Sequence, residues 1–398
     1  MSTADSQSSQ KVLVIQRGAR HRYSIPRLLE NAKLLEALYT DSSAYSTAGR
    51  IAAKFSDMGP RVQALASRIP ESIPREKVFS SDKPLISSLS RTVISSDMSG
   101  VFKRWGLQGA GIVYSMYGEE LDFLRWAKAQ GAKIIVDVFI SPLSNQVVLD
   151  EQDKFDVPSG FRVDASECDY SPDRGVGAFA PIADILLCPS EWVAEGVRKF
   201  VPDCAHKIRI VPYGSSLHPK NQEGDNLGRI LFAGRDPLRK GLPYLAEAVH
   251  RLRQSGMNLD VRVAGLEQQE CNWFPHYQEL NYLGLVKMDK MGEEFARADA
   301  FILPSLSEGQ AGVLLEALSY GCPVIATRES GVDLTQNENG ILVDAASGKQ
   351  IEEAIARIIQ DRDFRAKLSE NGRAFFEQNF SMNLWQERLT KVVRELQS

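Results

Sequence analysis

The chain has 398 residues, of which 43% are apolar and 25% are charged, and its formal net charge is −4. This length is enough for about two to three domains with cores of their own, and the near-neutral charge provides no global field that would favour nucleic acid. No apolar run approaches the roughly 18 residues of a membrane-spanning helix, and the polar first ten residues lack the apolar core of a signal peptide, so we expect neither.

The five cysteines are scattered along the chain and show no C-x-x-C spacing. Cys188 and Cys322 lie in apolar runs, where cysteine is typically an unreactive core residue. This pattern argues against a zinc site and favours a reducing, cytoplasmic location.

The first predicted elements are a strand over residues 11–16 and a helix from about residue 25 to 37, whose apolar residues form one face. The turn at residues 17–22 joins them and contains Gly18 and three arginines. Two interpretations of this turn remain open: a solvated basic turn, or a source of positive charge for ligand phosphates.

Residues 42–106 show no clean periodicity, so we assign no elements there. They hold ten basic and five acidic residues, a local excess of five positive charges, with aromatic residues interleaved. A solvated face explains this composition, and so does contact with an anionic membrane surface or a lipid phosphate; both interpretations stay open.

From residue 111 onward, apolar runs alternate with helical patterns, which predicts parallel sheets covered by helices on both faces. In the first half we expect strands at residues 112–115, 133–138, 184–188 and 208–211. A polar stretch without periodicity at residues 215–228 is the best linker candidate. Beyond it we expect strands at residues 229–234, 259–265, 280–284, 299–304, 322–327 and 340–343, and then a helical tail over residues 349–398.

Two glutamates mark the stretch at residues 305–327, where a buried strand leads through a Gly-rich turn into a helix. Gly309 and Gly312 let a ligand approach the backbone, and first-turn amides of the helix can receive phosphate oxygens. Glu308 precedes these amides, and Glu316 follows at a distance that suits a ribose diol. A nucleoside diphosphate carrying a sugar meets all three demands, whereas a helix-dipole glutamate followed by a solvated one is the simpler alternative.

The sequence EGQAGVLLEALSYGCPVIA at residues 308–326 resembles the E-x7-E signature of retaining GT-B glycosyltransferases, specifically family four. The sequence ILFAGRDPLRKG at residues 230–241 resembles the G-R-x4-K-G segment of the same family. Smaller similarities are CPSEW at residues 188–192, VPYG at 211–214 and VAG at 263–265. The resemblance extends from about residue 184 to 344 and is thin before that.

This resemblance implies an α/β protein of the GT-B class, with two doubly wound Rossmann-like domains facing a central cleft. It implies an N-terminal acceptor-side domain at residues 1–214, a linker at 215–228 and a nucleotide-sugar-binding domain at 229–380. Residues 381–398 are expected to form a terminal helix that packs back on the N-terminal domain.

The activity implied is that of a hexosyltransferase, which moves a sugar from a nucleoside-diphosphate sugar to a hydroxyl acceptor, a glycan or a lipid-linked one, with retention. A nucleotide-sugar epimerase or a non-catalytic nucleotide-sugar-binding protein is the alternative. We expect no cofactor and no catalytic metal, because Arg235 and Lys240 can stabilise the leaving diphosphate. The single D-x-D, residues 361–363, lies in a charged helical tail and is interpreted as surface. The expected location is cytoplasmic, free or peripheral on the inner membrane face.

The resemblance also assigns site residues. Glu308, Arg235 and Lys240 are expected to be catalytic. Gly18 lies in the first strand-to-helix turn, which approaches the donor phosphates in this family, and Asp137 lies near the place where many members have a histidine facing the donor sugar. The expected substrate-binding residues are Gly18, Asp137, Gly309, Gln310, Ala311, Gly312, Val313, Leu314 and Glu316.

Overall fold

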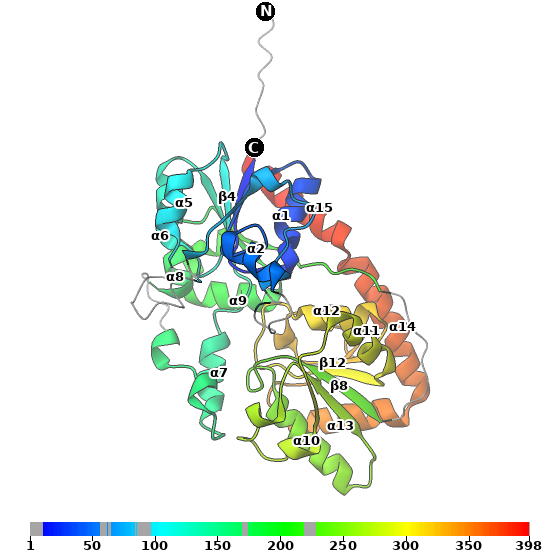
Figure 1. Cartoon of the computed structure of the whole chain (residues 1–398). Coiled ribbons are helices and arrows are strands. Elements are labelled where there is room, and N and C mark those ends of the chain that lie inside the picture. The colour runs from blue at the N-terminus through cyan, green and yellow to red at the C-terminus, as the bar shows by residue number, and fades with distance from the viewer. Residues whose placement is uncertain are drawn as a thin grey trace, which may run out of the picture.

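Two parallel sheets, one in each half of the chain, organise the structure, a computed structural model (Figure 1). It describes residues 11–55, 62, 65–83, 85, 97–168, 174–218 and 228–397. The expected polar tail at residues 1–10, residues 219–227 of the expected linker and parts of the basic stretch at 42–106 lie outside the described residues. None of the helices in the described part is long and apolar enough to cross a membrane.

The N-terminal sheet has seven strands in the order β3-β2-β1-β4-β5-β6-β7, all of them parallel. The strands are β1 (Val12–Ile15), β2 (Leu35–Thr40), β3 (Val78–Ser80), β4 (Ile112–Met116), β5 (Lys133–Asp137), β6 (Ile185–Cys188) and β7 (Ile208–Ile210). The principal helices are α1 (Ser24–Asn31), α2 (Thr47–Lys54), α5 (Ser99–Trp105), α6 (Leu121–Ala129), α7 (Ser144–Gln152), α8 (Gly175–Phe179) and α9 (Glu191–Phe200). The strand order reverses between β1 and β4, where Val14 lies opposite Leu38 on one side and Tyr114 on the other.

The helix predicted from about residue 25 to 37 is wrong in its second half, because α1 ends at Asn31 and β2 begins at Leu35. Lys33, between them, takes a left-handed backbone conformation (φ 60°) that a helix cannot continue through. Most residues of β2 are buried on both faces of the sheet, so its sequence lacks the alternation that marks a strand. Strand β3, within the stretch left unassigned, was not predicted at all.

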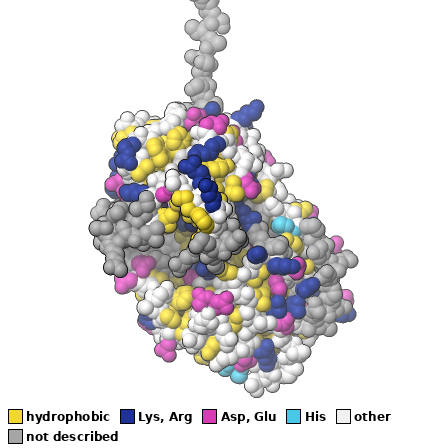
Figure 2. Space-filling model, in the orientation of Figure 1, with side chains coloured by type: hydrophobic (Ala, Val, Ile, Leu, Met, Phe, Trp, Pro, Cys, Tyr) yellow, Lys and Arg dark blue, Asp and Glu magenta, His cyan; other side chains and the backbone are white. Residues whose placement is uncertain are grey.

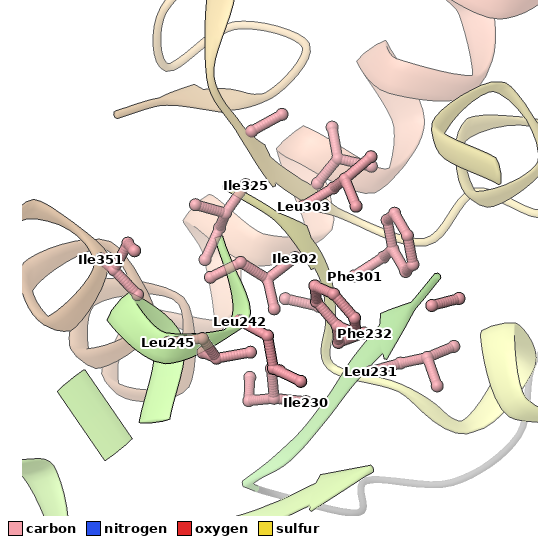
Figure 3. Close-up of a cluster of buried hydrophobic side chains, with 14 of the residues drawn as sticks. Ile230, Leu231, Phe232, Leu242, Leu245, Phe301, Ile302, Leu303, Ile325 and Ile351 are labelled. Atoms are coloured by element: carbon pink, nitrogen blue, oxygen red, sulfur yellow. The ribbon is translucent and has the colours of Figure 1, made fainter. Parts of the chain in front are cut away.

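The C-terminal sheet has six parallel strands in the order β10-β9-β8-β11-β12-β13, and all six were predicted. They are β8 (Arg229–Ala233), β9 (Asp260–Ala264), β10 (Asn281–Gly284), β11 (Ala300–Leu303), β12 (Val324–Ala326) and β13 (Ile341–Leu342). The helices are α10 (Leu242–Gln254), α11 (Met288–Arg297), α12 (Gly312–Ser319), α13 (Gly348–Gln360), α14 (Arg362–Asn379) and α15 (Met382–Gln397). Figure 3 shows the core of this sheet, where Phe232 and Ile302 from the central strands lie among side chains of α10 and α13.

A segment from each half of the chain packs against the core of the other half. Helix α15 runs back to the N-terminal sheet, where Trp385, Leu389 and Val393 are buried in one cluster with Val12 and other β1 residues. In the opposite direction, Val148 of α7 and Val157 after it are buried in the C-terminal core. These exchanged contacts join the two halves of the chain.

Candidate functional site

The two predicted motifs meet where the strand order of the C-terminal sheet reverses, between β8 and β11. The loop after β8 carries Arg235 and Lys240, and the loop after β11 carries Glu308. Loops leaving the carboxyl ends of strands at such a reversal form the usual ligand crevice of a doubly wound sheet. Chain topology therefore brings together Lys240 and Glu308, 68 residues apart in sequence.

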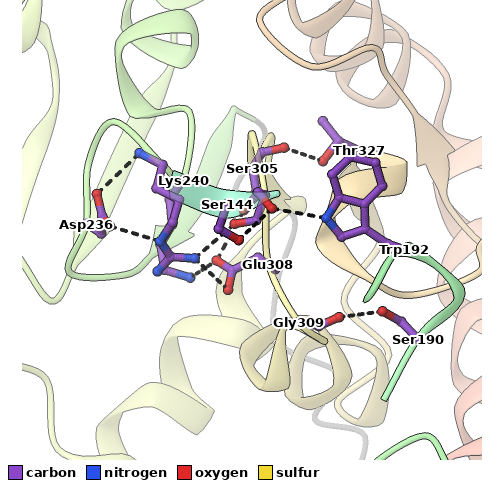
Figure 4. Close-up of polar contacts among 11 residues, drawn as sticks. Ser144, Ser190, Trp192, Asp236, Lys240, Ser305, Glu308, Gly309 and Thr327 are labelled. Carbon is purple, nitrogen blue, oxygen red and sulfur yellow. Dashed lines mark hydrogen bonds and ion pairs between the residues drawn. The ribbon is translucent and has the colours of Figure 1, made fainter. Parts of the chain in front are cut away.

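Glu308 is a buried carboxylate held between two cations (Figure 4). Lys240 Nζ donates to Glu308 Oε1 at 2.5 Å, and Arg239 Nη1 lies 2.9 Å from Glu308 Oε2. Burial alone would raise the pKa of Glu308, but the charges of Lys240 and Arg239 outweigh it and hold the pKa below its ordinary value. The carboxylate is thus ionised and fixed in direction.

Arg239 is a site residue that the sequence analysis missed. Its Nε donates to Asp236 Oδ2 at 2.9 Å and its Nη1 to the Ser307 carbonyl at 2.9 Å, so it links the loop after β8 to the loop after β11. The available signal was its place beside Lys240, in a segment with three cations among six residues. Spacing alone could not show which of the three faces Glu308.

The other two cations differ in environment. Arg235 is exposed and, among the described residues, has no hydrogen bond or ion pair, so its guanidinium is free to meet a ligand. The Lys240 side chain is largely buried. Its aliphatic part packs against Gly234 at the end of β8, where an added Cβ would lie 2.0 Å from Lys240 Cδ. Glycine at this position lets the lysine reach Glu308.

The first residues after Glu308 contact the N-terminal domain. An added Cβ on Gly309 would lie 1.7 Å from the Phe139 carbonyl oxygen, and the Gly309 carbonyl accepts a hydrogen bond from Ser190 Oγ at 2.6 Å. Gln310 Oε1 accepts from the Tyr213 amide at 2.7 Å. Protein atoms thus contact Gly309 and the Oε1 of Gln310, whereas Gln310 Nε2 is buried without a hydrogen-bond partner; the role of both residues in substrate binding stays a prediction.

Helix α12 presents the start expected for an anion site. The first-turn amides of an α-helix have no partner within the helix, and Gly312, the first residue of α12, is exposed with nothing within 4 Å of an added Cβ. Ala311 and Leu314 are buried beneath it, and Val313 is half-buried, so these three position the turn.

Glu316 lies one turn further along α12 and faces the N-terminal domain. Burial raises the pKa of Glu316, and the charge of Arg22, from the turn after β1, opposes this rise. Arg22 is exposed, and it takes a left-handed backbone conformation (φ 52°), as do its neighbours His21 and the buried Tyr23. The basic turn of the N-terminal half and the glutamate of the C-terminal half therefore lie close enough to interact electrostatically.

Gly18 opens the same turn, with φ 69° and its amide donating to Asp41 Oδ1 at 2.8 Å. Nothing lies within 4 Å of an added Cβ, but the Gly18 carbonyl also accepts a hydrogen bond from Gln16 Nε2 at 3.3 Å, so a contact of this backbone with a ligand stays a prediction. Arg17 and Arg20 are paired with the buried Glu120 and Glu119, at 3.7 Å in both cases. This pairing leaves Arg22 as the arginine of the turn that remains for an anionic ligand.

Asp137 ends β5 inside the N-terminal domain. Its carboxylate accepts hydrogen bonds from Tyr114 Oη at 2.5 Å and from Tyr213 Oη at 2.7 Å. Burial raises the pKa of Asp137 to about 6, against the opposing hydrogen bonds of the two tyrosines and the charge of Arg20. With both oxygens bound to protein, contact with a donor sugar stays a prediction.

The expected surface position of the D-x-D is confirmed, because residues 361–363 are exposed. Asp361 Oδ1 accepts from the Phe364 amide at 2.9 Å and caps α14. This capping role explains the aspartate without a metal.

Residues 215–375 match the family model described as glycosyl transferases group 1. The lipopolysaccharide core biosynthesis glycosyltransferase LpsE of Rhizobium meliloti is 31% identical over 158 residues, 38% of this chain and 45% of that protein. The GDP-mannose-dependent alpha-(1-6)-phosphatidylinositol monomannoside mannosyltransferase of Mycobacterium tuberculosis is 25% identical over 242 residues, 56% of this chain and 60% of that protein. The chain thus spans about half the length of the curated relatives it matches.

Solved structures match nearly the whole chain. A sucrose-phosphate synthase from Thermosynechococcus elongatus superposes with a TM-score of 0.68 at 17% identity, covering 97% of this chain and 99% of that one. Anabaena Alr3699/HepE in complex with UDP-glucose gives 0.62 at 14% identity, covering 97% and 100%. These likenesses confirm the predicted fold class. Residues 215–375 match the group 1 glycosyl transferases, and the whole chain has the two-domain fold of the GT-B glycosyltransferases.

Proposed function

We propose that the protein is a retaining glycosyltransferase of family four, transferring a hexosyl group from a nucleoside-diphosphate sugar to a hydroxyl acceptor. The observation that carries this proposal is the buried, ionised Glu308 between Lys240 and Arg239, next to the open first turn of α12. A fixed negative charge beside fixed positive charges suits a sugar that becomes cationic while its leaving diphosphate becomes anionic.

In this proposal the diphosphate binds the first turn of α12, with Arg235 and Lys240 as its cations, and Glu316 receives the ribose hydroxyls. Glu308 contacts the donor sugar. Because its carboxylate is already held by two cations, it is a poor covalent nucleophile, which favours substitution on one face of the sugar and retention of configuration. The structure of HepE with UDP-glucose supports a nucleotide-sugar donor.

For the acceptor we propose a hydroxyl of a glycan or a lipid-linked glycan, bound by the N-terminal domain at the cytoplasmic face of the membrane. The names of the relatives support this class, since they act in lipopolysaccharide core biosynthesis, capsular polysaccharide biosynthesis and phosphatidylinositol monomannoside mannosylation. These names favour transfer over the alternative of epimerisation or binding without catalysis.

Incubation with UDP-, GDP- and ADP-sugars, followed by product analysis, tests the proposal. We expect slow release of free sugar and nucleotide from one donor, with the anomeric configuration of the first-formed sugar retained by NMR. Glu308→Gln serves as the matched control and should release little. An isomerised sugar would establish an epimerase, and inversion at the anomeric carbon would exclude the retaining mechanism.

Turnover is expected to continue in excess EDTA, because in this proposal Arg235 and Lys240 stabilise the leaving diphosphate without a metal. The measurement compares initial rates with and without EDTA, well below the unfolding temperature, and then with added Mn²⁺. Activity that disappears in EDTA and returns with Mn²⁺ would contradict the proposed site.

Membrane contact is expected at α2, where Ile51 and Phe55 are 54% and 52% exposed and lie beside Arg50 and Lys54. Figure 2 shows basic and hydrophobic side chains together on this face.

The protein should cosediment with anionic but not neutral liposomes, and salt should release it. Replacing Ile51 and Phe55 together by serine should weaken binding about tenfold or more. The control Ile210→Ser, at an exposed site on β7, should not; equal binding to both liposome types would favour a solvated face.

A further inference from the structure

Two histidines and a glutamate converge on the outer side of the C-terminal domain. His250 lies in the C-terminal half of α10, while His276 and Glu279 lie in the short turn that precedes β10. Each of the three side chains offers one atom that could bind a metal, and these three atoms lie within 4.8 Å of one another.

The cluster centres on a single carboxylate oxygen. His250 Nδ1 lies 2.6 Å and His276 Nδ1 3.4 Å from Glu279 Oε1. The two imidazole rings are stacked, with centroids 3.7 Å apart and planes inclined by 15°. A hydrogen bond to Glu279 would explain the position of His250. It does not explain why the ring of His276 also faces the same carboxylate oxygen.

The backbone departs from its preferred range to make this arrangement. His276 is left-handed, with φ 62°, which is uncommon for a residue other than glycine. Arg253 Nη1 donates to the Glu279 carbonyl at 2.5 Å and lies 3.6 Å from Glu279 Oε2. Arg253 thus fixes the turn and holds one carboxylate oxygen, which leaves Oε1 directed at the histidines.

Two imidazole nitrogens and a carboxylate oxygen form a ligand set that suits zinc and similar divalent transition metals, with a water in the remaining position. The three side chains are 27–33% exposed, so an ion can enter from solvent and a water can complete its shell. We propose that His250, His276 and Glu279 bind a divalent transition metal ion. The absence of C-x-x-C spacing argued against a cysteine-bound zinc site, and it carries no information about a site made of two histidines and a glutamate.

The position of the cluster makes this a structural site. Helix α10 begins at Leu242, after Gly241, which lies close to the carbonyl of Pro304 just beyond β11, and the helix runs back to the opposite end of the strands. Glu279 also lies at that opposite end, just before β10 begins at Asn281. The ion would join α10 to the connection between β9 and β10, away from Glu308, and take no part in transfer.

Metal titration of the full-length, chelator-treated protein tests this inference. We expect one equivalent of Zn²⁺ to bind by calorimetry and to raise the unfolding temperature. His250→Ala and His276→Ala should each weaken binding about tenfold or more, and Glu279→Gln, which keeps the side-chain size, should do the same. Circular dichroism establishes that each variant is folded.

His206→Ala is the matched control, because His206 is exposed in the N-terminal domain and should leave zinc affinity unchanged. With Co²⁺ in place of zinc, the visible spectrum should show nitrogen and oxygen ligands. A thiolate charge-transfer band, or equal zinc affinity in the wild type and His250→Ala, would overturn the proposal. Donor cleavage should be the same in His250→Ala as in the wild type, which separates this test from that of the proposed function.

Discussion

Arg235→Ala and Lys240→Ala are each expected to lower kcat about 10²–10³-fold, the usual cost of removing one preorganised donor to developing charge. In the proposed function negative charge grows on the diphosphate as the sugar departs, and these two cations lie in the loop that follows β8, where Lys240 lies beside Glu308. Initial rates of donor cleavage at saturating donor measure the effect.

The two variants should differ in stability, because only one of the side chains is engaged in the free protein. Arg235 is exposed and unpaired among the described residues, so its loss should leave the unfolding temperature unchanged. Lys240 pairs with the buried Glu308, so its loss should lower that temperature as well. Arg104→Ala, at an exposed site on α5, is the control. Near-wild-type rates in both variants would show that the phosphates bind elsewhere.

Glu308→Gln is expected to depress kcat while nucleoside-diphosphate affinity stays nearly intact, whereas Glu316→Gln should weaken the diphosphate and the nucleotide sugar alike. In the proposed function Glu308 contacts the donor sugar as that sugar becomes cationic, so its loss should act mainly on the transition state. In the proposed function Glu316 contacts the nucleoside equally in the ground and transition states, so its loss should raise KM more than it lowers kcat.

Calorimetry with the diphosphate alone, on both variants, separates these roles. Glutamine keeps the size of glutamate, so packing in the crevice is preserved. Glu308→Gln also leaves Lys240 and Arg239 without their anion, and a lowered unfolding temperature is expected there. If Glu308→Gln loses diphosphate affinity and Glu316→Gln does not, the donor binds in the reverse direction.

Much of the fold could be predicted because the C-terminal strands are short apolar runs bounded by polar turns. Runs such as that of β11, Ala300–Leu303, are wholly buried and lead into helices with clear starts. Strand β2 could not be predicted in this way, because its sequence, LEALYT, fits the end of a helix as well as a strand. The left-handed Lys33, which ends the helical path before it, has no signature in the sequence.

For the candidate site, sequence motifs identified Lys240 and Glu308 but not their surroundings. The second cation on Glu308, Arg239, depends on how two loops meet across the sheet, which spacing along the chain does not encode. The contact of Gly309 with Phe139 depends on the docking of the two domains. The tyrosines on Asp137 come from two other segments of the fold, so this pairing too was outside the reach of the sequence.

The return of α15 to the N-terminal sheet has a consequence for how the protein is made. Trp385 and Val393 complete the cluster around β1, yet the ribosome synthesises the whole C-terminal sheet between these two parts. During that interval the apolar residues of β1 and α1 lack their final cover, so the nascent N-terminal half is exposed to aggregation or in need of a chaperone. A fragment ending before α15 would keep this deficiency permanently.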